Sequence, residues 1–128
     1  MNTEEIKNGI TKIKPVEHRL QPIKSAGNIL IIDDSYNSSP AAAKEAVEVL
    51  ARFKNKRKLY ITPGMVEMGN RAKEAHREIG QQLLGAADVV ILIKNSVTPY
   101  IEEGIVSVSS RADARDLHRI ISVFALRI

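Results

Sequence analysis

Short apolar runs alternate along this chain with segments in which apolar residues recur every three or four positions. The runs are rich in branched side chains and predict strands at residues 29–33, 59–62 and 88–94. The first run is short and continuous, as a strand covered on both faces requires. Helices are predicted after Pro40, over residues 70–84, in a short piece at 96–104, and over 112–122, with a further strand at 105–109.

The apolar stripe of each longer helix marks the side that faces the core. The helix after Pro40 has Ser39 as a plausible cap, because a serine hydroxyl can accept a free backbone amide and proline is tolerated at the first helical position. The inward positions are Ala43, Ala46, Val47, Leu50 and Phe53 in this helix, Ala75, Ile79, Gln82 and Leu83 in the next, and Leu117, Ile120 and Ile121 in the last. Alternating strands and helices predict a Rossmann-like, three-layer α/β domain with a mostly parallel sheet and helices on both faces.

The first 27 residues differ from the rest of the chain. Pro15 and Pro22 bracket a polar segment, and Gly27 precedes the first apolar run. We therefore expect a leading strap or linker over 1–27, with short extended pieces, and the regular domain over 28–128.

Composition narrows the class of protein. With 128 residues, 44% of them hydrophobic and 27% charged, the chain suits one globular domain. It has neither cysteine, nor an apolar run long enough to span a membrane, nor a signal-peptide pattern, so we expect a cytoplasmic protein without a membrane role. The net charge is +4, but the basic run 52–58 lacks interleaved aromatic residues, which disfavours a nucleic-acid partner.

Two adjacent carboxylates, Asp33 and Asp34, follow the first apolar run. Neighbouring residues on a strand point to opposite faces, which disfavours one acid/base pair. A carboxylate here could accept hydrogen bonds from ribose hydroxyls, bind Mg²⁺, or hold the following turn; binding and structural roles stay equally open. Ser35 and Asn37 add polar groups near a helix start, for anion binding or for ordinary capping.

The segment TPGMVEMG, residues 62–69, follows the second apolar run. It lacks both the GxxxxGK[ST] pattern of phosphate loops and the GxGxxG fingerprint. Glu67 could contact a ligand amine or position a loop amide. Because ligands settle beyond the carboxyl ends of parallel strands, we expect this loop and the acidic segment to rim one crevice. His76 and His118 are expected on helix surfaces, and the histidine spacing predicts no metal site.

Three segments in order, PVEHRLQ, IIDDSYNSSPAAAKEAVEVL and LYITPGMVEMG, resemble the carboxyl-terminal domain of Mur ligases. The resemblance covers roughly residues 10–122. It implies a cytoplasmic enzyme of peptidoglycan synthesis that uses ATP and Mg²⁺ to activate a carboxylate as an acyl phosphate, which an amine then attacks. The similarity is greatest to members that add D-alanyl-D-alanine to a UDP-muramoyl tripeptide.

The resemblance also implies roles for individual residues. Arg19 would reach the ATP phosphates when the domain closes, and Asp34 would hold the nucleotide ribose. Asn37 would line the nucleotide site, while Gly64 and Glu67 would line or shape the substrate side. A guanidinium suits phosphate charge, and a carboxylate can accept two hydroxyl hydrogen bonds.

Departures from the family pattern limit what the chain can do. The domain that carries the family's phosphate loop and Mg²⁺ ligands is not in this sequence, so we expect no turnover by the isolated chain. Ser39 stands where family members commonly have asparagine, and the sequence stops at SVFALRI where they continue with another strand. An open sheet edge would favour self-association. The alternatives are a noncatalytic nucleotide- or protein-binding module derived from this fold, or an unrelated nucleotide-binding domain.

Overall fold

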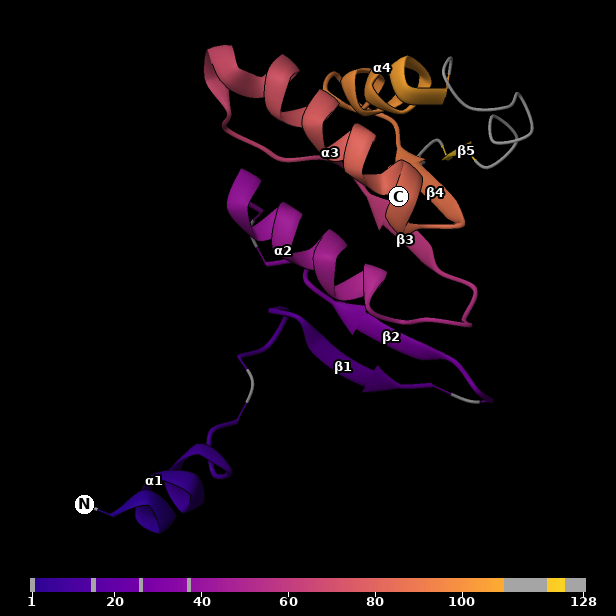
Figure 1. Cartoon of the computed structure of the whole chain (residues 1–128). Coiled ribbons are helices and arrows are strands. Elements are labelled where there is room, and N and C mark those ends of the chain that lie inside the picture. The colour runs from indigo at the N-terminus through magenta and orange to yellow at the C-terminus, as the bar shows by residue number, and fades with distance from the viewer. Residues whose placement is uncertain (1, 15, 26, 37, 110–119, 124–128) are drawn as a thin grey trace, which may run out of the picture. The chain divides into compact units, whose positions relative to one another are not determined.

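The computed structural model describes residues 2–14, 16–25, 27–36, 38–109 and 120–123 (Figure 1). Its contacts divide the chain into two compact units, Met1–Tyr36 and Asn37–Ile128. The expected boundary between a leading strap and the main domain near residue 28 stays a prediction.

The first unit begins with a helix that the sequence pattern did not lead us to expect. Helix α1 spans Thr3–Ile10. Asn2 Oδ1 accepts a hydrogen bond from Glu5 N at 2.9 Å, and the Glu5 carboxylate accepts one from Asn2 N at 2.7 Å. This reciprocal capping box satisfies two backbone donors that a helix start leaves free, which explains why so polar a segment is helical.

Two strands complete the first unit as an antiparallel pair. Strand β1 spans Gln21–Lys24 and β2 spans Leu30–Asp33, with Gln21 opposite Asp33 and Lys24 opposite Leu30. Leu30 and Ile31 remain 50% and 46% exposed, so the first unit does not by itself cover both faces of this strand. A short apolar run does not distinguish a strand in a hairpin from one in a central sheet.

The second unit carries most of the helices and a parallel sheet. Its elements are α2 (Pro40–Ala51), β3 (Leu59–Thr62), the short 3₁₀ turn η1 (Gly69–Arg71), α3 (Ala72–Ala86), β4 (Val89–Ile93), α4 (Thr98–Ser109) and β5 (Ile120–Val123). Ser39 caps α2 by accepting from Ala42 N at 3.2 Å, with Pro40 at the first position, as predicted. The predicted strands at 59–62 and 88–94 and the helices after Pro40 and over 70–84 are confirmed.

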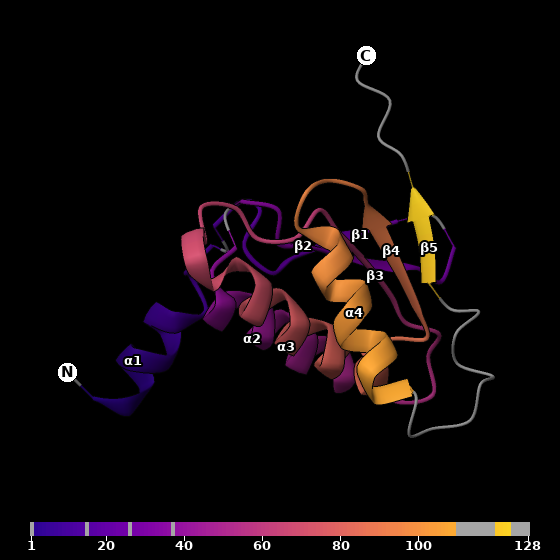
Figure 2. The same ribbon diagram turned by 90° about the horizontal axis from the view of Figure 1, so that it is seen from above.

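The sheet of the second unit has the order β3-β4-β5, and both pairs are parallel. Since the strand order advances in one direction, right-handed crossovers place α3 and α4 on the same face, where α2 lies beside α3 (Figure 2). The α/β class with a parallel sheet is thereby confirmed. The carboxyl ends of β3 and β4 meet at one edge, which brings together the loops that follow them.

Helix α4 corrects one sequence interpretation. A short helix followed by a strand at 105–109 was predicted, but the whole segment Thr98–Ser109 is one helix. Ile101 and Ile105, four positions apart, are 1% and 3% exposed and face the core together. Residues 120–122, predicted as the end of a last helix, belong to β5; the rest of that predicted helix, 112–119, lies outside the described residues.

Helices α3 and α4 pack unusually close because glycines lie at their crossing. A Cβ atom on Gly80 would collide with the carbonyl oxygen of Ile101, and one on Gly104 would collide with that of Arg77. The absence of a side chain at both positions therefore lets the two backbones touch. The hydrophobic core of the second unit includes side chains of these two helices and comprises Ala43, Val47, Met65, Ala75, Ile79, Leu83, Ala86, Ala87, Val90, Leu92, Ile101 and Ile105.

Candidate functional site

The residues singled out from the sequence fall into two groups, one in each unit. We call residues 18–20 with 33–36 the turn cluster, in the first unit, and residues 62–69 the glycine loop, in the second. The turn cluster contains Arg19 and Asp34, and the glycine loop contains Gly64 and Glu67. Asn37 lies outside the described residues. The crevice expected between the two groups stays a prediction.

The pairing of β1 with β2 builds the turn cluster. Because Gln21 lies opposite Asp33, the segment before β1 runs beside the segment after β2. Asp34 Oδ1 accepts a hydrogen bond from Leu20 N at 3.0 Å, and Tyr36 N donates one to His18 O at 3.2 Å. The structure therefore brings Arg19 and Asp34, which are 15 positions apart in the sequence, into one small turn.

The backbone of this turn adopts conformations that side chains disfavour. His18 has φ 60° and Leu20 has φ 43°, both in the left-handed region. For a residue as bulky as leucine such a φ is costly, and it persists only where the surroundings hold it. The carboxylate of Asp34 supplies that support through the amide of Leu20.

Arg19 and Asp34 remain available for a ligand in different ways. The guanidinium carbon of Arg19 lies 4.7 Å from the ring centroid of Tyr36, a cation–π arrangement that orients the group while leaving its N–H donors at the surface. Asp34 is half-buried and uses only Oδ1 in its bond to Leu20; Oδ2 has no hydrogen bond to another described residue. The turn thus presents a cation of a kind suited to phosphate groups and an acceptor of a kind suited to hydroxyl groups.

Asp33 is used differently from its neighbour. Its Oδ2 lies 2.7 Å from His18 Nδ1, and its Oδ1 accepts from Ser35 N at 3.0 Å. The hydrogen bond from Ser35, followed by that from His18, lowers the pKa of the Asp33 carboxyl, and the hydrogen bond and charge of Asp33 raise the pKa of His18. Asp33 therefore holds the turn, which is one of the roles left open for the acidic pair.

Gly64 is essential to the path of the glycine loop. It has φ 83°, and a Cβ atom there would lie 2.8 Å from His76 Nε2 and 2.9 Å from Val97 Cγ2. Its amide donates to Thr62 Oγ1 at 2.9 Å. Both the backbone conformation and the close neighbours thus exclude any side chain at this position.

His76 lies under this loop, which corrects the expectation that it would be on a helix surface. Its side chain is fully buried, and Nε2 accepts a hydrogen bond from Met65 N at 2.8 Å. Nδ1 then carries the proton and donates to Ala72 O. The burial of His76 had a signal in the sequence, because His76 adjoins the inward stripe of α3 at Ala75 and Ile79. The loop that it contacts could not be identified from residue spacing.

Asn95 is a second residue that sequence reasoning missed. Its side-chain N–H donates to Pro63 O at 2.5 Å, and its Oδ1 accepts from Val97 N and Thr98 N at 2.9 and 3.1 Å. One amide group therefore fixes both the glycine loop and the turn that begins α4. The signal available in the sequence is an asparagine shortly before Thr98 and Pro99, typical of a turn that starts a helix.

The tip of the glycine loop is exposed. Val66 is 61% exposed, and Glu67 is an exposed residue with φ 59°. The carboxylate of Glu67 makes no hydrogen bond or ion pair with another described residue. It is therefore free to meet a donor from outside the chain.

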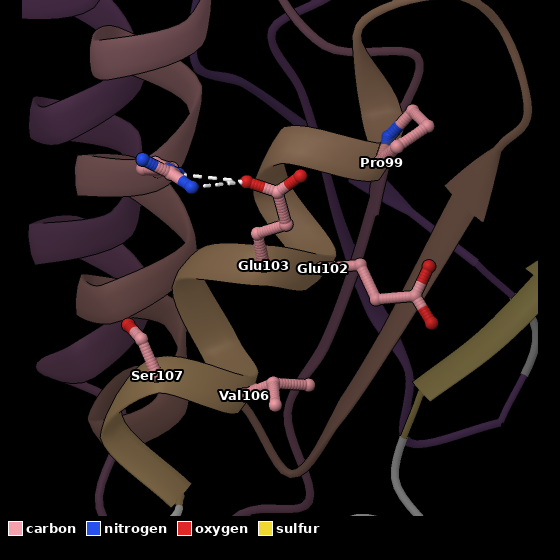
Figure 3. A pocket seen from close by; sticks show the side chains of 6 residues that line it. Pro99, Glu102, Glu103, Val106 and Ser107 are labelled. Carbon is pink, nitrogen blue, oxygen red and sulfur yellow. Dashed lines mark hydrogen bonds and ion pairs between the residues drawn. The ribbon is translucent and has the colours of Figure 1, made fainter.

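A hollow of ≈ 470 Å³ lies on the outer surface of α3 and α4 (Figure 3). It is lined by Arg77, Pro99, Glu102, Glu103, Val106 and Ser107, none of which belongs to the turn cluster or the glycine loop. Among the described residues there is no group of three or more His, Cys, Asp or Glu able to hold a metal ion, and no described helix is long and apolar enough to cross a membrane.

Comparison with known protein families identifies the family to which the chain belongs. The family described as "Mur ligase, glutamate ligase domain" matches residues 18–125, and the chain belongs to this family. The match begins at the turn cluster and includes the glycine loop and the whole described sheet. The resemblance inferred from the three sequence segments is thereby confirmed.

Two individual relatives show which kind of Mur ligase the chain resembles. The chain is 37% identical over 78 residues to the UDP-N-acetylmuramoyl-tripeptide–D-alanyl-D-alanine ligase of Escherichia coli and 33% identical over 79 residues to that of Haemophilus influenzae. The matches cover 61% and 62% of this chain but only 17% of each relative. The matched segment thus spans about a sixth of the length of these ligases.

Solved structures of MurF ligases are also similar to this chain. The MurF ligase of Thermotoga maritima in complex with ADP is similar over 88% of this chain and 28% of that one, with a TM-score of 0.64 and 27% identity. A MurF structure from Acinetobacter baumannii covers 98% of this chain and 25% of that one, with a TM-score of 0.73 and 20% identity, and supports the fold alone.

Proposed function

We propose that this chain provides the carboxyl-terminal, nucleotide-facing domain of an ATP-dependent ligase that joins D-alanyl-D-alanine to UDP-N-acetylmuramoyl-tripeptide in the cytoplasm. The observation that carries the proposal is the placement of Arg19 and Asp34 in one turn, within the segment that matches the family. The names of the relatives supply the substrates, and the ADP-bound neighbour supports the nucleotide.

The chemistry of the turn cluster suits this role. The guanidinium of Arg19 would neutralise phosphate charge on ATP, and the free oxygen of Asp34 would accept hydrogen bonds from the ribose. ATP supplies the phosphoryl group that activates the substrate carboxylate as an acyl phosphate. The residues of this chain would orient the nucleotide and leave attack by the amine to groups on the remainder of the ligase.

Mg²⁺, which the family resemblance implies, fits less well on this chain. The described residues offer no cluster of three metal ligands, and both carboxylate oxygens of Asp33 are already engaged by His18 and Ser35. We therefore assign no step to Mg²⁺ here and expect its ligands elsewhere in a complete ligase.

The proposal is tested by rebuilding a complete enzyme around this chain. In a chimera, residues 18–125 replace the corresponding segment of the Escherichia coli ligase, and phosphate release is measured with ATP, Mg²⁺, tripeptide precursor and dipeptide. We expect release that depends on all substrates from the chimera and none from the purified chain. An inactive but folded chimera, or robust turnover by the chain alone, would overturn the proposal.

Variants of the chimera test the two assigned residues. Removing a charge-assisted hydrogen bond costs about 1.5–3 kcal/mol, so Arg19→Ala and Asp34→Ala are each expected to raise the KM for ATP by roughly ten- to a hundredfold. Lys44→Ala, which removes an exposed cation from α2, is the matched control and should leave this KM unchanged. An unchanged KM in both test variants would show that the residue assignments are wrong.

A further inference from the structure

We propose that His76 is a positioning residue for the glycine loop: its buried imidazole acts as the acceptor that sets the geometry of residues 63–67 for ligation. The inference rests on the proposed function, in which this loop lies at the substrate side. His76 does not itself meet a substrate, because its side chain is fully buried.

The loop is fixed at successive backbone groups before it reaches its exposed tip. Pro63 O accepts from Asn95, Gly64 N donates to Thr62 Oγ1, and Met65 N donates to His76 Nε2. Of the three loop residues held in this way, Met65, which is bonded to His76, lies nearest the tip along the chain. Its hydrogen bond therefore sets the direction in which the loop leaves the fold toward Val66 and Glu67.

Histidine is chemically suited to this position. Nε2 must be an unprotonated acceptor to receive the Met65 amide, and the bond from Nδ1 to Ala72 O fixes the tautomer in which it is one. Gly64 packs directly against the imidazole, so the loop also follows the ring by contact. A buried hydrocarbon of similar size would keep the packing but leave the amide of Met65 without its acceptor.

The hydrogen bond between His76 and Met65 affects the position of Glu67, at the tip of the loop. Its carboxylate is exposed, and its backbone has φ 59°, so its position depends on how firmly the preceding residues are held. Displacement of a positioned group by about 1 Å can cost a hundredfold in rate. A weakened bond at Met65 should thus reduce turnover although no residue in contact with substrate has changed.

The first experiment uses the chain itself. Long-range ¹H–¹⁵N NMR should find the His76 proton on Nδ1; a proton on Nε2 would overturn the proposal. Amide exchange at Met65 is then compared in His76→Gln, whose side-chain oxygen can replace Nε2 as acceptor, and His76→Leu, which has none. We expect exchange at least about tenfold faster in the leucine variant and near that of the original chain in the glutamine variant. Equal exchange in the two variants contradicts the role.

The second experiment uses the chimeric ligase. We expect kcat/KM to fall by about tenfold or more for His76→Leu and to recover in His76→Gln. Leu83→Ala, which truncates a fully buried side chain about two turns further along the same helix, controls for lost stability and should lower Tm while retaining kcat/KM. Equal losses in both His76 variants would mean that the residue only fills the core. An inactive unsubstituted chimera would instead reject the proposed function, and the NMR result would still decide the role of His76.

Discussion

The side-chain amide of Asn95 donates a hydrogen bond to the carbonyl oxygen of Pro63, 32 positions earlier in the sequence. This bond joins the loop after β3 to the turn before α4. The oxygen of the same amide accepts two backbone hydrogen bonds in its own turn. One side chain therefore organises both loops at the carboxyl edge of the sheet.

Asn95→Asp separates these two functions. The carboxylate can still accept from the amides of Val97 and Thr98 but cannot donate to Pro63 O, which it would face with a negative charge. We expect a loss of about 1–3 kcal/mol in the free energy of unfolding, measured in urea. Asn95→Ala removes both functions and should cost more than Asn95→Asp. The interpretation fails if the aspartate variant is as stable as the original chain.

The glycines at the crossing of α3 and α4 give a second prediction. Gly80→Ala and Gly104→Ala each place a methyl group against a backbone carbonyl that cannot move independently, so each should destabilise the second unit by about 1–3 kcal/mol. Gly85→Ala is the control, because the space around Gly85 in α3 is open. It should be neutral or stabilise by up to about 1 kcal/mol. Thermal unfolding of the three variants measures this difference in stability. Equal stability of all three would show that α3 and α4 can move apart at no cost.

The ion pair between Arg77 and Glu103 also links α3 to α4 but should contribute little. Glu103 Oε2 lies 2.8 Å from Arg77 Nε, and the two side chains are 47% and 44% exposed. Exposed pairs are typically worth about 0–1 kcal/mol and are screened by salt. A double-mutant cycle with Arg77→Ala and Glu103→Ala should give a coupling energy in this range that falls with added salt. Coupling well above it would indicate that the pair is shielded from water.

The pair of His18 and Asp33 predicts a pH window for the turn cluster. The raised pKa of His18 means that its contribution is complete below the ordinary value of 6.5 and is lost as the pH rises through the folded-state pKa. The lowered pKa of Asp33 means that its contribution is complete above the ordinary value of 3.8 and is lost as the pH falls through the folded-state pKa. Both contributions are therefore complete only between these ordinary values.

NMR titration of the His18 ring protons measures this effect. Asp33→Asn should return the pKa of His18 toward 6.5, because the hydrogen bond and charge of Asp33 are the largest causes of the shift. Glu17→Gln is the matched control, since the charge of Glu17 is the smallest cause. It should change the titration far less than Asp33→Asn does. Similar shifts in both variants would show that general charge, rather than the specific contact, raises the pKa.

Much of the second unit could be predicted from the sequence because its signals are local. The capped start at Ser39 and Pro40 and the branched runs of β3 and β4 each depend on neighbouring residues. The pattern IVSVS at 105–109 was misleading, since alternation over so few residues also fits a helix in which Ile101 and Ile105 share a face. The partner of β2 depends on strand pairing, which no local pattern contains.

The candidate sites were predictable only in part. The roles proposed for Arg19 and Asp34 come from the family resemblance, whereas their common turn arises from the register that sets Gln21 opposite Asp33. The burial of His76 depends on a loop that begins 14 positions earlier, at Thr62, and folds back over the helix. Contacts of this kind are set by tertiary structure and leave no periodic signature.

The hydrogen bond from Leu20 to Asp34 implies communication inside the turn cluster. Leu20 directly follows Arg19, and its left-handed backbone depends on the carboxylate of Asp34. A hydroxyl-bearing ligand that draws this carboxylate toward itself would therefore also shift the peptide next to the arginine. Under the proposed function, a ribose bound at Asp34 would in this way move the backbone beside the guanidinium proposed to bind the phosphates, so that binding at one end of the nucleotide would affect binding at the other.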